Sequence, residues 1–155
     1  MLQAVPKHWY SWDYTVYDDQ DPIAELDVSW WREKGVLTID SIAHRIFREG
    51  IMSGAFILEL DSEVLARAEK PSALSRRIVI QCGGSTYSLI PRSMFGRSFQ
   101  LVDHAGVVGT LSPRGLFSRR MTIDLPAGLP LAVRVFIVWL TVILWKRDSD
   151  AAGAG

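Results

Sequence analysis

The sequence predicts an all-β protein with one central helix: a closed antiparallel barrel of about twelve strands around a hydrophobic C-terminal helix. Two observations predict this fold. Short apolar-rich runs alternate with turn signals at near-regular intervals between residues 14 and 125, as in antiparallel sandwiches and barrels. Residues 131–145, LAVRVFIVWLTVILW, contain a single charge, Arg134, and a helix that is apolar on every face must be hidden from water.

The strands form a series of short runs separated by turn residues, and closing them into a barrel leaves no free sheet edge. A barrel of this size has a lumen wider than its own side chains fill, so the apolar helix is the expected plug. The predicted strands are residues 14–17, 23–31, 36–39, 43–48, 55–60, 64–69, 76–81, 86–90, 98–102, 107–111 and 119–125. The predicted turns are residues 18–21, 34–35, 49–50, 61–62, 83–84 and 104–106.

The sequence also repeats itself. Residues 55–80 align without a gap on residues 98–123, a shift of 43, which places Phe56 on Phe99. The same shift places Ser75-Arg76-Arg77 on Ser118-Arg119-Arg120, and a fainter copy lies about 42 residues upstream. Each unit holds about four strands, except that the last ends in the apolar helix. Three such units are too few for a propeller, which typically needs four to eight blades.

The helix is expected to begin at Pro130, since proline is well placed in a first helical turn, and to end at Trp145. Its fifteen apolar residues span about 22 Å, short of a bilayer core of about 30 Å. Arg134 at a bilayer centre would cost about 2.5–3.5 kcal/mol. A buried core helix is therefore favoured. The alternative is a small tail-anchored membrane protein with residues 131–145 as its anchor.

A chain of 155 residues with nearly half apolar residues is long enough for one domain with a full core. We expect an N-terminal arm at residues 1–11, a barrel domain at 12–147 and a flexible polar tail at 148–155. The formal net charge is zero, which argues against nucleic acid as the main partner, although a local basic face is compatible with it. No secretory leader is visible, so a cytoplasmic location is expected, with peripheral membrane association if lipid is bound.

Basic residues around the two Ser-Arg-Arg motifs are the best candidates for a binding site. Guanidinium groups present planar forks of donors that suit phosphate oxygens, and if the repeats are adjacent, these residues converge on one face. Such a face suits an anionic lipid headgroup. The simpler interpretation is that they are solvated charges paired with nearby carboxylates. The candidate headgroup-binding residues are Lys70, Arg76, Arg77, Arg97, Arg119 and Arg120.

Other chemical groups give weaker indications of a metal-binding or catalytic site. The acidic run Asp18, Asp19 and Asp21, with Asp13 upstream, lacks the spacing of an EF-hand and is better explained as a turn. The histidines are far apart in sequence, and Cys82 is the only cysteine, with no identifiable activating base. We therefore expect a protein that is not an enzyme and that uses no metal or cofactor.

Aromatic residues are dense near the N-terminus. They suggest either a membrane-interface or stacking patch, or ordinary packing at the rim of a barrel. A tryptophan pair at adjacent strand positions points to opposite sheet faces, so we expect at least one of Trp30 and Trp31 to face outward. The aromatic residues are Trp9, Tyr10, Trp12, Tyr14, Trp30 and Trp31.

Strand-like runs at residues 56–59, 64–70, 87–89, 99–101 and 107–109 precede the apolar run 131–145. This order of elements resembles the Tubby C-terminal-like superfamily, which includes Tubby domains, phospholipid scramblases and LURP-one-related proteins. The resemblance covers residues 12–147 and implies a twelve-stranded barrel around a central hydrophobic helix. Some related barrels bind phosphoinositide headgroups or associate with membranes, but no lipid-binding motif matches residue by residue, and the cysteine-rich segment of scramblases is absent. A structural or regulatory protein-interaction domain is the remaining alternative.

Overall fold

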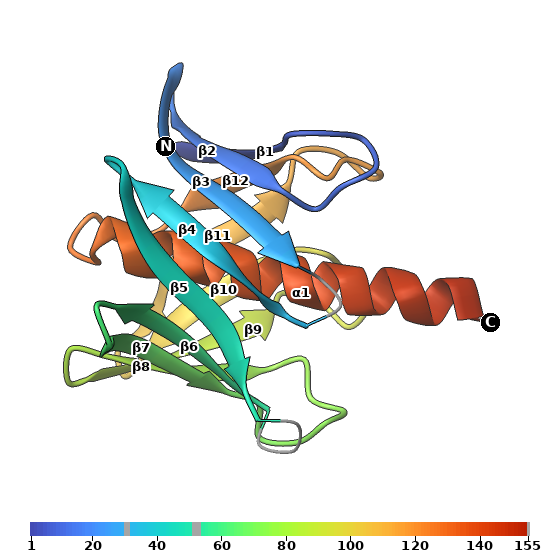
Figure 1. The fold of residues 1–155 in the computed structure, drawn as a ribbon. Coiled ribbons are helices and arrows are strands. Elements are labelled where there is room, and N and C mark those ends of the chain that lie inside the picture. Colours follow the sequence, from blue (N-terminus) through green and yellow to red (C-terminus); the bar gives the residue numbers. More distant parts are fainter. Residues whose placement is uncertain (30–31, 51–53, 155) are drawn as a thin grey trace.

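Twelve antiparallel strands form a closed barrel, and one helix runs through it, as the sequence predicts (Figure 1). The computed structural model describes residues 1–29, 32–50 and 54–154. The strands are β1 (Leu2–Pro6), β2 (Tyr14–Asp18), β3 (Asp21–Ser29), β4 (Lys34–Ile39), β5 (Ile42–Glu49), β6 (Ala55–Leu60), β7 (Glu63–Glu69), β8 (Ile78–Cys82), β9 (Ser85–Pro91), β10 (Phe99–Asp103), β11 (Gly106–Pro113) and β12 (Met121–Asp124), and the helix is α1 (Leu131–Ala154).

The N-terminal strand closes the barrel. Strands that follow each other along the chain pair side by side, and β1 pairs with β2 on one edge and with β12 on the other. Leu2 and Ala4 point into the core and are buried. The expected N-terminal arm at residues 1–11 is therefore wrong for Leu2–Pro6, because this short alternating run fills the gap between two strands that would otherwise be edges.

The turns opposite the long loops are tight hairpins. Asp40 and Ser41, Asp61 and Ser62, and Gly83 and Gly84 all have positive φ, the backbone geometry of a two-residue hairpin turn. The predicted turns at 61–62 and 83–84 are thus confirmed. The predicted turn at 34–35 is wrong, since both residues lie in β4. Gly35 is needed there for a close approach: a Cβ would lie 2.4 Å from the carbonyl oxygen of Asp27.

Three hairpins share one irregularity. The ladder shifts register between Val16 and Tyr17, between Leu58 and Glu59, and between Leu101 and Val102. These positions are 42 and 43 residues apart, the same offsets at which the sequence resembles itself. A β-bulge bends a strand and increases its twist, so the three hairpins curve the wall at equivalent points.

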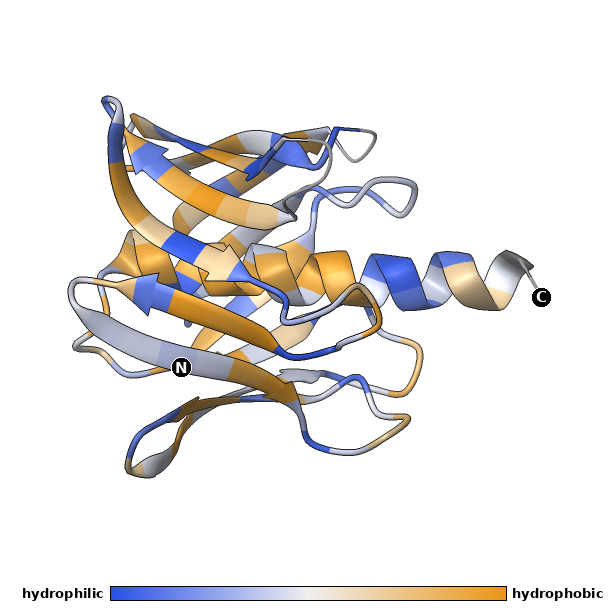
Figure 2. Ribbon diagram, turned by 90° about the horizontal axis from the view of Figure 1, so that it is seen from below, coloured by the Kyte–Doolittle hydropathy of each residue, from blue (hydrophilic) through white to orange (hydrophobic). Residues whose placement is uncertain are grey.

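Helix α1 fills the lumen with apolar side chains. Every residue from Val135 to Trp145 is at most 3% exposed, and Figure 2 shows this apolar part lying between the strands. The Trp139 ring packs edge-on against Phe56 at 5.6 Å between ring centroids and tilted against Phe136 at 5.8 Å. The charge within the first turns, Arg134, reaches back so that its Nε donates to the carbonyl of Leu129 at 3.0 Å.

The helix continues beyond its expected end. Its bounds are Leu131–Ala154, so the predicted end at Trp145 and the predicted flexible tail at 148–155 are wrong as far as Ala154. Lys146 and Asp150 form an i,i+4 ion pair at 2.6 Å on this polar extension, a spacing that supports helix. Among the described residues, no helix has both the length and the apolarity needed to span a bilayer.

Candidate functional site

The two ends of the barrel differ in construction. Tight turns surround the end where α1 begins, whereas longer loops surround the end where α1 leaves the barrel (Figure 1). We call four of these longer loops, residues 7–13, 70–77, 92–98 and 114–120, the exit rim. They follow one another around the barrel because β7 to β12 and then β1 and β2 are neighbours in the sheet. The site predicted from the sequence lies on this rim.

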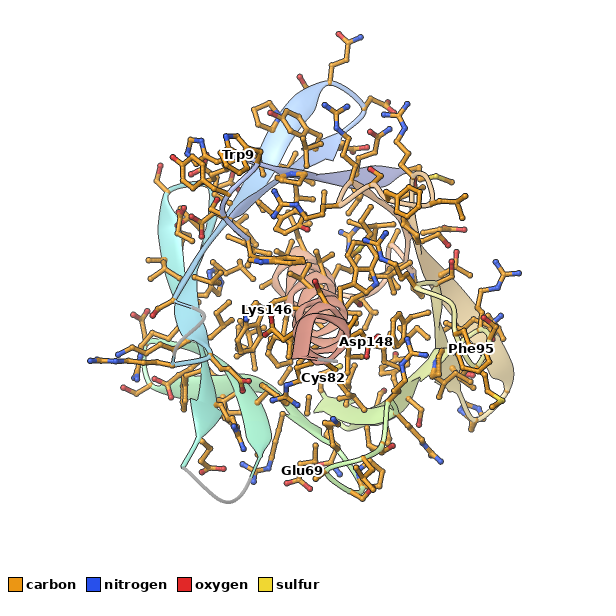
Figure 3. All side chains as sticks on the ribbon, turned by 90° about the vertical axis from the view of Figure 1, so that its right-hand side faces the viewer. Trp9, Glu69, Cys82, Phe95, Lys146 and Asp148 are labelled. Carbon is orange, nitrogen blue, oxygen red and sulfur yellow. The ribbon has the colours of Figure 1, made fainter. Side chains whose placement is uncertain are left out.

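Each loop of the exit rim carries large apolar side chains in water at its tip. Apart from Met1, they are the most exposed large hydrophobic residues in the part of the chain that the structure describes. In Figure 3, which looks along α1 from its C-terminal end, Trp9 and Phe95 lie on different sides of the helix. These tip residues are Trp9 (88% exposed), Tyr10 (69%), Leu74 (96%), Met94 (81%), Phe95 (92%), Leu116 (87%) and Phe117 (96%).

Charge is distributed unevenly between the two ends, although the chain as a whole is neutral. Loops 70–77, 92–98 and 114–120 contain eight lysines and arginines and no acidic residue. The opposite end has the reverse bias, with no lysine or arginine in its turns. Its acidic residues are Asp18, Asp19, Asp21, Asp40, Asp61, Glu63, Asp103 and Asp124. The barrel is therefore a charge dipole with its positive pole at the exit rim.

Arg76 ties its own loop to the next loop on the rim. Its guanidinium donates to the carbonyl oxygens of Met94 at 3.1 Å and Gly96 at 2.8 Å. One of its nitrogens also lies 3.1 Å from a carboxylate oxygen of Asp148 on α1. The guanidinium carbon is 5.3 Å from the centroid of the Phe99 ring. Most donor positions of Arg76 are thus occupied by the protein itself.

Arg97 and Arg119 repeat this arrangement further around the rim. Arg97 donates to the carbonyls of Leu116 at 3.2 Å and Ser118 at 2.7 Å and lies 4.3 Å from the Trp145 ring centroid. Arg119 donates to the carbonyls of His8 and Trp9, both at 2.7 Å, and to that of Ser11. It also lies 5.0 Å from the ring of Trp12.

We call Arg76, Arg97 and Arg119 the latch arginines, because each joins one rim loop to its neighbour. Their acceptors are in the same loops as the exposed tips, so they fix the backbone that presents the apolar residues. Burial lowers the pKa of Arg97, with the neighbouring Tyr14 opposing this effect. Burial also raises the pKa of Tyr14, to about 12, against the lowering influence of Arg119 and Arg97. Tyr14 therefore stays neutral at physiological pH and donates its hydroxyl proton to the Arg119 carbonyl.

Four other arginines on the rim are exposed, and we call them the outer arginines: Arg77, Arg92, Arg114 and Arg120. Arg77 donates to the hydroxyl of Ser88 at 3.1 Å, and Arg114 makes a long contact of 3.4 Å with the side chain of Gln3. Within the described residues, the side chains of Arg92 and Arg120 have no hydrogen bond or ion pair. The outer arginines thus have free donors that face water.

The remaining predicted binding residue, Lys70, lies closer to the helix. Its Nζ donates to the Ala73 carbonyl at 3.3 Å. Burial is the main cause that lowers its pKa, and the neighbouring Arg147 lowers it further. Arg147 is itself paired with Glu33 at 2.8 Å. Charged side chains therefore lie beside α1 where the helix leaves the barrel.

The structure places all six predicted site residues on the exit rim but gives them different surroundings. Arg76, Arg97 and Arg119 are latches, Arg77 and Arg120 are exposed, and Lys70 is half-buried. Arg76 and Arg77 point in different directions, since Arg76 contacts the next loop and α1, while Arg77 contacts Ser88 on β9.

The N-terminal aromatics do not form one patch. Trp9 and Tyr10 are exposed at a loop tip, Trp12 is half-buried beneath Arg119, and Tyr14 is fully buried in the core. The expectation for Trp30 and Trp31 falls outside the described residues. Trp12 and Tyr14 thus pack within the protein, whereas Trp9 and Tyr10 are exposed to water.

The acidic residues, His44 and Cys82, which are the weaker candidates for a metal-binding or catalytic site, do not lie together. Asp13 lies on the exit rim, where its carboxylate accepts from the backbone N–H of Val28, whereas Asp18 and Asp19 are at the opposite end. Among the described residues there is no group of three or more potential metal ligands. Nδ1 of His44 lies 3.2 Å from the carbonyls of Leu37 and Ile42. Burial raises the pKa of the Cys82 thiol, which lowers its nucleophilicity at neutral pH.

Most of the apolar loop tips were not among the functional candidates that the sequence predicts. A signal exists: apolar pairs recur at residues 9–10, 51–52, 94–95 and 116–117, outside the predicted strands and at multiples of about 21 residues. An apolar pair in a turn between strands contradicts the usual polar composition of turns. Residues 51–52 belong to this sequence pattern but lie outside the described residues.

Comparison of the chain with protein-family models, with curated proteins and with solved structures found no match in any of the three. The resemblance to the Tubby-like superfamily thus stays a prediction from the order of the sequence elements, and any function must be argued from the exit rim itself.

Proposed function

We propose that this protein is a non-enzymatic barrel that binds an anionic membrane surface through its exit rim. The observation that carries the proposal is the set of seven exposed apolar side chains at the loop tips, from Trp9 to Phe117, five of which share their loops with eight basic residues and no acid. Exposed apolar groups rimmed by polar residues mark an interaction surface. Interleaved cations select a surface with negative charge.

Burial of the apolar tips and attraction of the basic residues to anionic lipid contribute free energies of similar size. Burying a large apolar side chain completely contributes about 1.5–3 kcal/mol, and partial burial of several tips contributes a comparable total. Each Lys or Arg near an anionic bilayer contributes about 1 kcal/mol. Neither contribution alone gives stable anchoring, since firm membrane attachment generally requires two signals. The exit rim supplies both.

The geometry of the loops suits the layered structure of a bilayer surface. Arg92 precedes Met94 by two residues, and Arg114 precedes Leu116 by two residues. Two residues span at most about 7 Å, and interfacial apolar groups sit about 5–10 Å deep at the boundary between headgroups and acyl chains. Tips at that boundary thus place the outer arginines at the level of the lipid phosphates.

The polar extension of α1 is compatible with this docking. Asp148 and Asp150 are paired with Arg76 and Lys146, so their negative charges are compensated beside an anionic surface. Residues 151–154 are small, AAGA, and the nine residues from Lys146 to Ala154 add about 14 Å of helix beyond Trp145. The paired charges of the extension therefore do not repel an anionic surface, although the extension projects beyond the loops of the exit rim (Figure 1).

The alternatives fit the exit rim less well. The tail-anchor hypothesis requires residues 131–145 in a bilayer, yet these residues are enclosed by the strands. A protein partner would also use exposed aromatics and arginines, but it does not by itself account for tips spread around a projecting helix. Nucleic acid would account for the arginines and for stacking aromatics, but not for Leu74 and Leu116.

A vesicle experiment tests the proposal. Phe95→Ser together with Phe117→Ser should lower partitioning to vesicles of 30% phosphatidylglycerol in phosphatidylcholine by about tenfold or more, measured by flotation. Both side chains are more than 90% exposed, so these variants should fold normally. The matched control is Val64→Ser together with Val107→Ser, which removes apolar residues 54% and 56% exposed near the opposite end. Equal loss in both pairs, or no binding by the unaltered chain, would contradict the proposal.

A further inference from the structure

We infer that the exit rim recognises the density of negative charge on a membrane and not a particular lipid headgroup, and that the outer arginines are the residues that do so. The inference rests on the proposed function and goes further in naming the class of lipid: any anionic lipid, in proportion to the surface charge it supplies.

The first reason is that the latch arginines already donate hydrogen bonds to the protein itself. Selective recognition of one phosphorylated headgroup needs several donors that converge on one pocket. Arg76, Arg97 and Arg119 instead give their forked donors to backbone carbonyls of the neighbouring loops at 2.7–3.2 Å. Breaking these bonds to bind a phosphate would leave those carbonyls without their charged donors.

The second reason is the distribution of the free cations. Arg77, Arg92, Arg114 and Arg120 belong to three different loops, and each is exposed. Arg92, Arg114 and Arg120 lie in the same loops as the apolar tips, whereas Arg77 reaches along the wall, where the hollow that it lines involves Ser88, Asp103 and His104 but, in the described part of the chain, no other arginine. Separate cations of this kind respond to the summed potential of a surface, which falls off within a Debye length.

The third reason is the charge dipole of the whole barrel. The acidic residues of the opposite end, such as Asp19, Asp40 and Asp61, repel an anionic surface when the barrel approaches in the wrong orientation. The same field turns the exit rim toward the membrane before contact. Orientation by a long-range field depends on the total charge of the surface and is indifferent to headgroup stereochemistry.

The test compares two anionic lipids at equal surface charge. Vesicles of phosphatidylcholine contain either phosphatidylglycerol or phosphatidylinositol 4,5-bisphosphate, adjusted to the same zeta potential, and partitioning of the full chain is measured by flotation. We expect partition coefficients that agree within about twofold and that fall together as salt is raised. A preference of tenfold or more for the phosphoinositide at equal charge would overturn the inference while leaving the proposed function intact.

Variants assign the effect to the outer arginines. Arg114→Gln together with Arg120→Gln should weaken partitioning to both vesicles by about fivefold for each lost cation. The control is Arg45→Gln together with Arg67→Gln, which changes net charge equally but affects wall residues paired with Glu59 and Glu49. Equal losses in both pairs would overturn the assignment. No binding of the unaltered chain to either vesicle would overturn the proposed function as well.

Discussion

At the scale of single residues, the arginines of the exit rim have two roles that the sequence does not distinguish. Each Ser-Arg-Arg motif supplies one latch arginine and one outer arginine, in the order Arg76 and Arg77, then Arg119 and Arg120. The first of each pair is bound by carbonyls of a neighbouring loop, and the second is exposed. Adjacent residues diverge in this way because successive side chains in extended backbone point in opposite directions.

The paired motif provides a matched comparison. Arg119→Gln should lower the free energy of unfolding by about 2–3 kcal/mol, because it removes charge-assisted bonds to three carbonyls and the contact with Trp12. Arg120→Gln, one residue further, should change it by less than about 0.5 kcal/mol, since that side chain is exposed. Urea unfolding measures both. Equal midpoints for the two variants would contradict the latch role of Arg119.

The sequence predicts which residue types form this site, but it does not predict which of them join the loops and which face water. Clustering of Lys70, Arg76, Arg97 and Arg119 on one rim follows from the repeat and from the barrel. Their partners could not be predicted, because the acceptors are backbone carbonyls, which every residue carries. The exposed tips could have been recognised, since apolar pairs such as Met94-Phe95 contradict their turn context.

At the scale of elements, α1 and β1 determine whether the barrel exists. The helix supplies an apolar surface on all sides from Val135 to Trp145, and every strand of the wall contributes buried apolar residues that face it. Strand β1 supplies the last ladder, which joins β2 to β12. Loss of the helix would leave a lumen lined with apolar side chains and nothing to fill it.

One charge placed at two positions of α1 tests this dependence. Val138 is 1% exposed in the core, and Val138→Asp should destabilise the barrel by more than about 4 kcal/mol, because it buries an unpaired carboxylate. Ser149→Asp adds the same charge on the exposed extension and should leave folding unchanged. Circular dichroism and gel filtration report the outcome. A folded, monodisperse Val138→Asp variant would show that α1 is not the core.

The elements differ in how well the sequence predicts them, and the reasons are physical. Most strands and the apolar helix are predicted by local patterns of period two and by uniform apolarity. β1 is missed because LQAVP is short and ends in proline, and because its partner β12 lies far away along the chain. The helix runs past Trp145 because ion pairs such as Lys146–Asp150 and Arg76–Asp148 support its polar turns.

At the scale of the whole molecule, a neutral composition conceals a polarised structure. Equal numbers of acidic and basic residues give a formal net charge of zero, yet the topology sends basic loops to one end and acidic turns to the other. Alternate connections in an antiparallel barrel lie at opposite ends. A charge bias that alternates along the chain therefore becomes a dipole along the barrel axis, parallel to α1.

The most direct test of the central claim asks which end of the barrel meets the membrane. In a Cys82→Ser background, a polarity-sensitive fluorophore is attached either to Phe95→Cys on the exit rim or to Val64→Cys near the opposite end, positions 92% and 54% exposed. On addition of vesicles with 30% phosphatidylglycerol, the account predicts a blue shift at position 95 and none at 64. A shift at 64 without one at 95, or none at either position while the protein binds the vesicles, would contradict it.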